Sequence, residues 1–312
     1  MNNIIEVRNL EKSYKDNKVI KGITFEVERG EILCFLGPNG AGKSTTINVL
    51  IGALGYDKGD IYYKNRKIVN DDMEFKKCLG IVPQDISLYE DISAEKNIRF
   101  FASLYGLKGK ELDVKTEEAL EFAGLTDRKF DKVKTFSGGM KRRLNIACAI
   151  AHNPEVLIMD EPTVGIDPQS RNHILSCVKK MRDKGITIIY TTHYMEEVEE
   201  ISTRIIVMDK GEIIAEGTKE KLKEEVVKYK KLIIDADNLE NVDLEEFYNI
   251  EGVKKIRIND DKIEIETITG IENLDKIIIK LVNMGVAIRN LTCKTASLEN
   301  VFLSLTGKTL RD

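Results

Sequence analysis

The 312-residue chain has few of the residues from which zinc sites are built. Its 3 histidines do not cluster with its cysteines, and no Cys-x-x-Cys pair occurs. Cys34 and Cys148 lie within apolar runs, where cysteine usually serves as a small core residue. The cysteines are scattered and odd in number: Cys34, Cys78, Cys148, Cys177 and Cys293. A zinc site built from protein ligands is therefore not expected.

The chain also lacks segments that would direct a protein into a membrane. No apolar run approaches the roughly 18 residues that suggest a membrane-spanning helix. Met1–Glu6 has no basic start and no long apolar core, so it does not resemble a signal peptide. The 48 basic and 52 acidic residues are interspersed and give a formal net charge of -4, whereas nucleic-acid binders concentrate basic charge. We expect a cytosolic protein with no direct nucleic-acid partner.

Apolar runs predict a buried parallel sheet in the first two thirds of the chain. Strands covered on both faces are continuously apolar, and helical stretches separate such runs here. The runs are Ile32–Leu36, Val156–Met159, Ile186–Tyr190 and Ile205–Met208. Ile23–Val27 alternates between apolar and polar residues, as in a half-buried strand. Between about residues 90 and 135 the sequence predicts a helical insert, with helices at Ala94–Tyr105 and Leu112–Ala123.

The pattern changes after Gly217. Lys219–Lys231 is a charged stretch that predicts a helical connector. The order strand, helix, strand, strand, helix, strand follows and indicates a small ferredoxin-like α+β domain. These segments are Leu232–Asp235, Leu244–Ile250, Lys254–Ile258, Lys262–Thr267, Leu274–Met284 and Ala287–Thr292, with a last helix near Ser297–Leu305. We expect two domains, residues 1–220 and residues 221–312, because the chain exceeds one average domain.

A phosphate-binding loop is the first functional motif. The pattern G-x-x-x-x-G-K-[ST] matches Gly37, Pro38, Asn39, Gly40, Ala41, Gly42, Lys43 and Ser44. Glycines let backbone N–H groups turn toward phosphate oxygens, and a helix N-terminus adds a favourable dipole. Lys43 would reach the β- and γ-phosphates, Ser44 would hold Mg²⁺, and Thr45 would add a phosphate contact. The alternative is a glycine-rich turn without a ligand, but a predicted strand before the loop and a helix (Thr45–Ile51) after it favour the phosphate site.

Hydrolysis of a bound nucleotide also needs a carboxylate for the metal and a group that activates water. Asp160 and Glu161 end the apolar run Val156–Met159 and supply both. Asp160 fits the magnesium side, and Glu161 fits the group that polarises the attacking water. An acidic pair at the end of a strand is common by itself. Together with the phosphate-binding loop it indicates an ATPase or a related enzyme.

The segment between these motifs carries a resemblance to a known family. It reads Phe136, Ser137, Gly138, Gly139, Met140, Lys141, Arg142 and Arg143. The S-G-G run resembles the signature of the ATP-binding cassette (ABC) family, where it opens a helix and binds the γ-phosphate held by the opposite subunit. A serine hydroxyl, two glycines and a helix N-terminus suit an anion, and a capped helix start is compatible with that role. Met140 departs from the glutamine common there, as in many drug- and polymer-exporting members.

The resemblance covers residues 1 to about 218 and implies roles for further residues. Tyr14 would stack on adenine, Gln84 would contact the metal and couple to a membrane subunit, and Asp167 would face the partner subunit. His193 would contact the γ-phosphate. The implied fold is a P-loop NTPase cassette with a RecA-like parallel-sheet core and an antiparallel β subdomain. It also includes a helical subdomain at about residues 88–152.

The resemblance also implies a function. Pro83–Leu107 and Ala296–Gly307 resemble the drug- and polymer-exporting subfamily. This implies a homodimer that binds ATP and Mg²⁺, hydrolyses ATP, and drives a separate permease from the cytoplasmic face of the membrane. The alternatives are a soluble ABC ATPase that acts on ribosomes or DNA and a regulatory nucleotide binder. Ribosome-acting members typically carry two cassettes, and DNA-repair members carry coiled coils or zinc modules, whereas this chain has one phosphate-binding loop and neither insertion.

Overall fold

The computed structural model describes residues 2–69, 72–226, 229–294 and 297–306. Ala296 and Gly307, the ends of the segment that resembles exporters, lie outside these ranges. Contacts within the chain divide it into one unit of Met1–Lys219 and a second unit that begins at Glu220. Within the described ranges, no helix is both long enough and apolar enough to cross a membrane.

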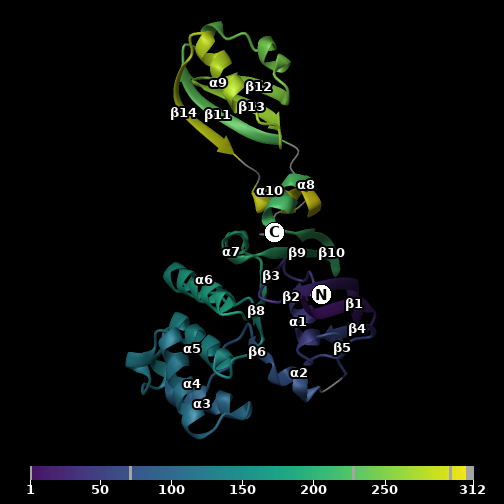
Figure 1. The fold of residues 1–312 in the computed structure, drawn as a ribbon, viewed down its shortest axis with the longest axis vertical. Coiled ribbons are helices and arrows are strands. Elements are labelled where there is room, and N and C mark those ends of the chain that lie inside the picture. Colours follow the sequence, from purple (N-terminus) through teal and green to yellow (C-terminus); the bar gives the residue numbers. More distant parts are fainter. Residues whose placement is uncertain (1, 70–71, 227–228, 295–296, 307–312) are drawn as a thin grey trace. The chain divides into compact units, whose positions relative to one another are not determined.

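A six-stranded sheet forms the centre of the first unit, with the strand order β10-β9-β3-β8-β7-β6 (Figure 1). All neighbouring pairs are parallel except β9 and β10, which are antiparallel. Every residue of β3, β7 and β8 is buried, so the parallel sheet predicted from the apolar runs is confirmed. The strands are β3 (Ile32–Leu36), β6 (Leu79–Val82), β7 (Val156–Asp160), β8 (Thr187–Thr192), β9 (Arg204–Asp209) and β10 (Glu212–Gly217).

A four-stranded antiparallel sheet in the order β2-β1-β4-β5 accompanies the main sheet. Val7 of this sheet, Phe35 of the main sheet and Ile47 of α1 belong to one buried apolar cluster. The helix α1 therefore packs with both sheets, which fixes the loop that precedes it. The elements are β1 (Asn3–Tyr14), β2 (Asn17–Glu28), β4 (Lys58–Tyr63), β5 (Arg66–Lys67), α1 (Lys43–Leu50) and α2 (Met73–Lys77).

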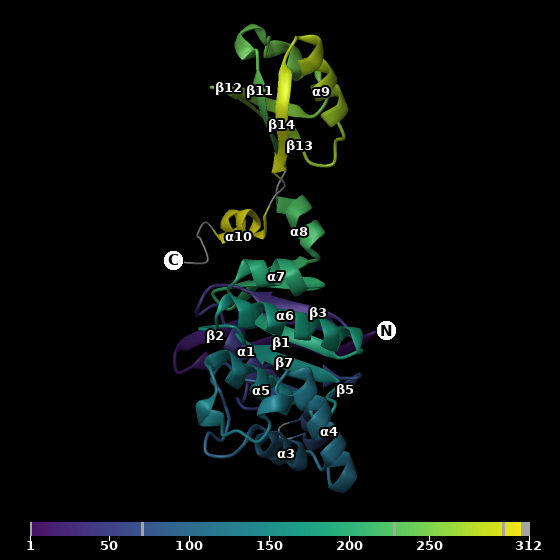
Figure 2. The same ribbon diagram turned by 90° about the vertical axis from the view of Figure 1, so that its left-hand side faces the viewer.

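The helical insert gathers at one end of the first unit (Figures 1 and 2). Ile98, Leu120 and Leu144 are buried in its own apolar core. Two further helices, α6 and α7, contact β8 of the main sheet. The bounds are α3 (Ala94–Leu104), α4 (Gly109–Phe122), α5 (Gly138–Ile150), α6 (Pro168–Asp183) and α7 (Met195–Ile201), with 3₁₀ turns at Thr126–Arg128 and Val133–Thr135.

The second unit contains an antiparallel sheet in the order β12-β13-β11-β14, which is the ferredoxin-like order. Ile234, Ile263, Ile277 and Leu281 contribute to its buried core. The bounds are α8 (Lys219–Val226), β11 (Tyr229–Asp237), β12 (Val253–Asn259), β13 (Lys262–Ile268), α9 (Leu274–Asn283), β14 (Ala287–Lys294) and α10 (Leu298–Thr306), with 3₁₀ turns at Leu239–Asn241 and Glu245–Asn249.

Two expectations for this unit were wrong in detail. The connector helix does not reach Lys231, because Tyr229–Lys231 pairs with β13 as the start of β11. The helix expected at Leu244–Ile250 is a short 3₁₀ helix, Glu245–Asn249. Its last bond runs from the N–H of Ile250 to the carbonyl of Phe247, and the chain then turns at Gly252, whose φ is 89°.

Candidate active site

The phosphate-binding loop joins β3 to α1 and depends on its glycines. A Cβ at Gly37 would lie 2.3 Å from the carbonyl oxygen of Met208 on β9, so only glycine fits there without a shift of backbone. Gly40 and Gly42 have φ values of 81° and 105°, which residues other than glycine rarely adopt. Gly42 also stands at the N-cap of α1 and has no side chain to cap the helix. The loop thus presents a helix N-terminus suited to an anion.

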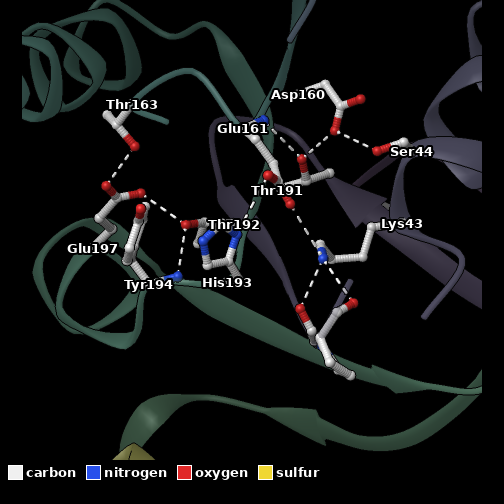
Figure 3. A network of polar contacts seen from close by, with 12 residues as sticks. Lys43, Ser44, Asp160, Glu161, Thr163, Thr191, Thr192, His193, Tyr194 and Glu197 are labelled. Atoms are coloured by element: carbon white, nitrogen blue, oxygen red, sulfur yellow. Dashed lines mark hydrogen bonds and ion pairs between the residues drawn. The ribbon is translucent and has the colours of Figure 1, made fainter. Parts of the chain in front are cut away.

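Lys43 is the first residue of α1, and 4% of its side chain is exposed. Figure 3 shows the contacts of its ammonium group. Its Nζ donates to the carbonyl oxygens of Gly37 at 2.7 Å and Pro38 at 3.1 Å. The same Nζ lies 3.3 Å from Oε1 of Glu161. Burial lowers the pKa of Lys43, and the negative charge of Glu161 opposes that shift. A cation therefore stands at the base of the loop, beside the carboxylate predicted to activate water.

The two carboxylates that end β7 face different partners (Figure 3). Oδ1 of Asp160 accepts from Oγ of Ser44 at 3.1 Å and from Oγ1 of Thr191. Glu161 has a φ of 44°, and its N–H donates to Oγ1 of Thr191 at 3.0 Å. Its Oε2 lies 3.3 Å from Nδ1 of His193. Left-handed backbone at a non-glycine residue is costly and is often found at functional sites.

The Ser44 hydroxyl and the Asp160 carboxylate are hard oxygen donors placed side by side, which fits Mg²⁺. This ion usually takes one or two carboxylates and completes its shell with phosphate oxygens and water. In the described part of the chain, no group of three or more His, Cys, Asp or Glu side chains is arranged to hold a metal. A magnesium ion held by Ser44 and Asp160 would take its remaining ligands from phosphate oxygens and water.

A cavity of about 150 Å³ opens at the loop. Gln84 lines it together with residues predicted from the phosphate-binding pattern and from the strand end: Asn39, Gly40, Gly42, Lys43, Ser44, Thr45 and Glu161. Tyr14 ends β1 and is 48% exposed, and it does not line this cavity. The S-G-G residues and Asp167 do not line it either.

The S-G-G segment forms a helix start of its own. Ser137 caps α5, and its Oγ accepts from the N–H of Met140 at 3.3 Å. Gly139 packs so closely on the start of α6 that a Cβ would lie 2.1 Å from Oγ of Ser170. Asp167 caps α6 by accepting from the N–H of Ser170 at 2.9 Å, and this bond lowers the pKa of Asp167. The segment and the Asp167 turn are thus neighbours.

Sequence reasoning missed several residues that hold the site together. The hydroxyl of Thr191 donates to the carboxylate of Asp160 and accepts from the backbone N–H of Glu161. Arg142 is 3% exposed and donates from Nη1 to the carbonyl oxygen of Pro83 at 2.7 Å and from Nη2 to that of Gln84. Glu197 is completely buried on α7. Glu197 lies four residues before the apolar Ile201, a spacing that places both on one helix face and could have predicted its burial. The neighbouring acidic residues make Glu197 look like part of an exposed charged run.

The loop, the buried lysine and the paired carboxylates together define a P-loop nucleotide hydrolase. The family described as "ABC transporter" matches residues 20–164. The linearmycin resistance ATP-binding protein LnrL of Bacillus subtilis (strain 168) is 41% identical over 99% of this chain and 100% of its own. The Nod factor export ATP-binding protein I of Cupriavidus metallidurans is 34% identical over 100% of both chains.

Solved structures agree with these relatives. The structure of cbiO1 from Clostridium perfringens, part of the ABC transporter complex cbiONQ, has a TM-score of 0.67 and 33% identity over 72% of this chain and 92% of its own. The cassette MJ0796, a dimer in a post-hydrolysis state bound to ADP and Pi, has a TM-score of 0.63 and 27% identity over 69% of this chain and 98% of its own. The chain belongs to the ATP-binding proteins of the ABC transporter family, and it is an ATP-binding ATPase with the cassette fold.

Replacement of Gly37 by alanine should weaken ATP binding, because the added Cβ would force the loop away from Met208. Overpacking typically costs about 1–3 kcal/mol. We therefore expect the Kd for ATP, measured by isothermal titration calorimetry, to rise by about five- to about 150-fold. Gly55→Ala is the matched control, because a Cβ there meets nothing within 4 Å. Equal affinities in the two variants would contradict the assigned role of Gly37.

Proposed function

We propose that this chain is the ATP-hydrolysing motor of a membrane exporter, working as a homodimer around two ATP molecules and driving a separate permease. The observation that carries the dimer is the position of the S-G-G segment: Gly139 packs against Ser170 at the start of α6, beside Asp167, and no residue of the segment lines the cavity at the phosphate-binding loop. A second chain would then supply that segment. The cassette MJ0796, which is dimeric in a post-hydrolysis state bound to ADP and Pi, supports a dimer of this chain. Export is supported by one relative that is a Nod factor export protein, and a second relative confers linearmycin resistance, which export of the compound would explain.

In this proposal the residues of one chain bind the nucleotide and place the attacking water. Lys43 neutralises phosphate charge, and Glu161 accepts a proton from the water, with His193 beside it. Mg²⁺, when bound, would offset phosphate charge. The residues that would hold it are Ser44, Gln84 and Asp160, and those that would hold ATP are Tyr14, Gly37, Pro38, Asn39, Gly40, Ala41, Gly42, Lys43, Ser44 and Thr45. The second chain would contribute Ser137, Gly138, Gly139 and Asp167.

The helical subdomain offers a surface for the permease. Tyr89 and Phe100 are 53% and 39% exposed, and their ring centroids lie 5.0 Å apart in an edge-to-face arrangement. The buried side chain of Asn97 binds both the N–H and the carbonyl of Tyr89, which fixes this loop on α3. Exposed apolar clusters often mark protein contacts. The permease would hold the chain at the cytoplasmic face of the membrane, while residues 221–312 would form an accessory domain.

Glu161→Gln should preserve ATP affinity and remove most turnover, because glutamine keeps the shape of glutamate but cannot act as a base. General-base contributions are typically about 10²–10⁴-fold, so kcat should fall by that factor. Steady-state ATPase kinetics and light scattering would measure the loss and the accumulation of an ATP-bound dimer. Lys43→Ala should differ by weakening nucleotide binding itself. Unchanged turnover in the glutamine variant would remove Glu161 from its assigned role.

Mixing two inactive variants tests whether the active site is shared. Lys43→Ala damages the phosphate-binding loop and leaves the S-G-G segment intact, whereas Ser137→Arg does the reverse. Each homodimer should be inactive, but a mixed dimer has one site with both halves intact. If half of the dimers are mixed and the sites act independently, the mixture should regain at most about a quarter of wild-type ATPase activity.

If the mixture regains no ATPase activity, a second measurement on the same mixture distinguishes two explanations. Activity would also stay absent if both sites had to work together. ATP-dependent dimerisation distinguishes the two cases, because a shared site still favours the mixed dimer over either homodimer. The absence of both rescued turnover and preferential mixed dimers would overturn the shared site.

The permease contact can be tested by fractionation of cells that make the full chain from its own locus. Phe100→Ser should shift the protein from the membrane fraction to the soluble fraction, because it removes the exposed ring on α3. ATPase activity of the purified variant should stay within about twofold of wild type. Val114→Ser is the control, since Val114 is 55% exposed on α4 and is not part of the aromatic cluster. Equal membrane fractions for both variants would contradict the proposed surface.

A further inference from the structure

Glu197 is a buried carboxylate to which the proposed function assigns no role. It lies on α7, four positions after His193, and its side chain points toward Thr163 and Thr192 (Figure 3). None of the residue is exposed. A charged or polar group in such a position is costly unless hydrogen bonds satisfy it. Three hydroxyl groups do so here, from Thr163, Tyr190 and Thr192. These partners come from two segments that both border the active site.

The two carboxylate oxygens of Glu197 serve different segments. Oε1 accepts from Oγ1 of Thr163 and lies 3.5 Å from Nε of Arg171. Thr163 and Arg171 stand on either side of the turn 164–167, which ends at the α6 cap. Oε2 accepts from the hydroxyl of Tyr190 at 3.0 Å and from Oγ1 of Thr192 at 2.9 Å. Tyr190 and Thr192 belong to β8, which leads directly to His193.

The hydroxyl of Thr192 relays this contact to the backbone at His193. It accepts from the N–H of Tyr194 at 2.9 Å while it donates to Glu197. A hydroxyl has one proton, so the accepted N–H and the carboxylate together fix its direction. Thr192 precedes His193 and Tyr194 follows it, which means that the backbone around His193 is oriented from Glu197.

A second route leads from Arg171 to the same histidine. The guanidinium carbon of Arg171 lies 4.7 Å from the ring centroid of Tyr194, within the range of a cation–π contact. The Tyr194 ring centroid in turn lies 4.2 Å from that of His193. Arg171 and Thr163 thus bring the turn 164–167 into contact with the neighbours of His193.

We propose that Glu197 is a positioning residue, which ties the turn 164–167 to the backbone at His193 and so keeps His193 beside Glu161. This inference rests on the roles given to His193 and Glu161 in the proposed function. Asp167 at the end of the turn is proposed to face the second subunit. A shift of that turn at the dimer interface would therefore move the Glu197 carboxylate, and with it the backbone at His193 of the same chain.

Because each oxygen of Glu197 accepts hydrogen bonds from a different segment, a substitution that removes one acceptor tests the proposal. Glutamine has one carbonyl oxygen, so in Glu197→Gln one of the two segments would face an amide N–H₂ and lose its acceptor. We expect kcat to fall about ten- to a hundredfold, because a misplacement of about 1 Å can cost about 10²-fold, while KM for ATP changes little. Thr192→Val, which breaks only the relay, should show the same separation of kcat from KM.

Thr116→Val is the matched control for the threonine variant. Thr116 is 1% exposed on α4 and donates to the carbonyl oxygen of Leu112 at 2.7 Å, so it loses a comparable buried hydrogen bond far along the chain from the site. Its kcat should equal that of the wild type. Wild-type kcat in both Glu197→Gln and Thr192→Val would overturn the proposal, as would an equal loss of kcat in Thr116→Val.

A double-mutant cycle on the full chain separates positioning from a general structural role. If Glu197 acts through His193, Glu197→Gln should lower kcat by no more than roughly twofold in a His193→Ala background. Thr192→Val serves in the same cycle if the glutamine variant does not fold. If Glu197→Gln lowered kcat by the same factor in the His193→Ala background as in the wild type, the positioning role would be overturned and the proposed function would remain intact. Wild-type turnover in His193→Ala alone would instead overturn the role of His193, and the inference with it.

Discussion

The ion pair between Lys43 and Glu161 is the contact on which the arrangement of the active site depends. Both side chains are almost completely buried, with 4% and 7% exposed. Two buried charges are tolerated only when they are close together and their remaining hydrogen-bonding groups are satisfied. The carbonyl oxygens of Gly37 and Pro38 satisfy the ammonium group. The loop and the Glu161 carboxylate therefore meet at the same ammonium group.

The sheet order brings these two residues together across an intervening strand. Lys43 follows β3 and Glu161 follows β7, and β8 lies between those strands. Parallel strands end at the same edge, where ligands of such sheets bind. Thr191 near the end of β8 contacts Asp160 through its hydroxyl and holds the backbone of Glu161. One central threonine thus sets the positions of both carboxylates relative to the phosphate-binding loop.

The sequence allowed prediction of the features that depend on neighbouring residues. Gly37–Ser44 is contiguous, and β3 and the run Val156–Met159 of β7 are continuously apolar, so their conformations could be inferred locally. The contacts behind the site join residues far apart in the chain. Thr163 meets Glu197 across 34 positions, and Arg142 meets Pro83 across 59. No local pattern encodes such pairs, which is also why β11 was expected to start after Lys231: its pairing with β13 decides where it begins.

Arg142 shows how the helical subdomain is connected to the nucleotide cavity. Its guanidinium binds the carbonyl oxygens of Pro83 and Gln84, and Gln84 lines that cavity. The same helix, α5, begins at the Ser137 cap. A helix is stiff over this length, so a displacement of Ser137 must also displace Arg142 and the backbone that it holds. In the proposed dimer, Ser137 contacts the nucleotide bound by the partner chain, whereas Gln84 lines the nucleotide cavity of its own chain. In that dimer the buried arginine would couple the two nucleotide sites, as Glu197 is proposed to couple the Asp167 turn to His193.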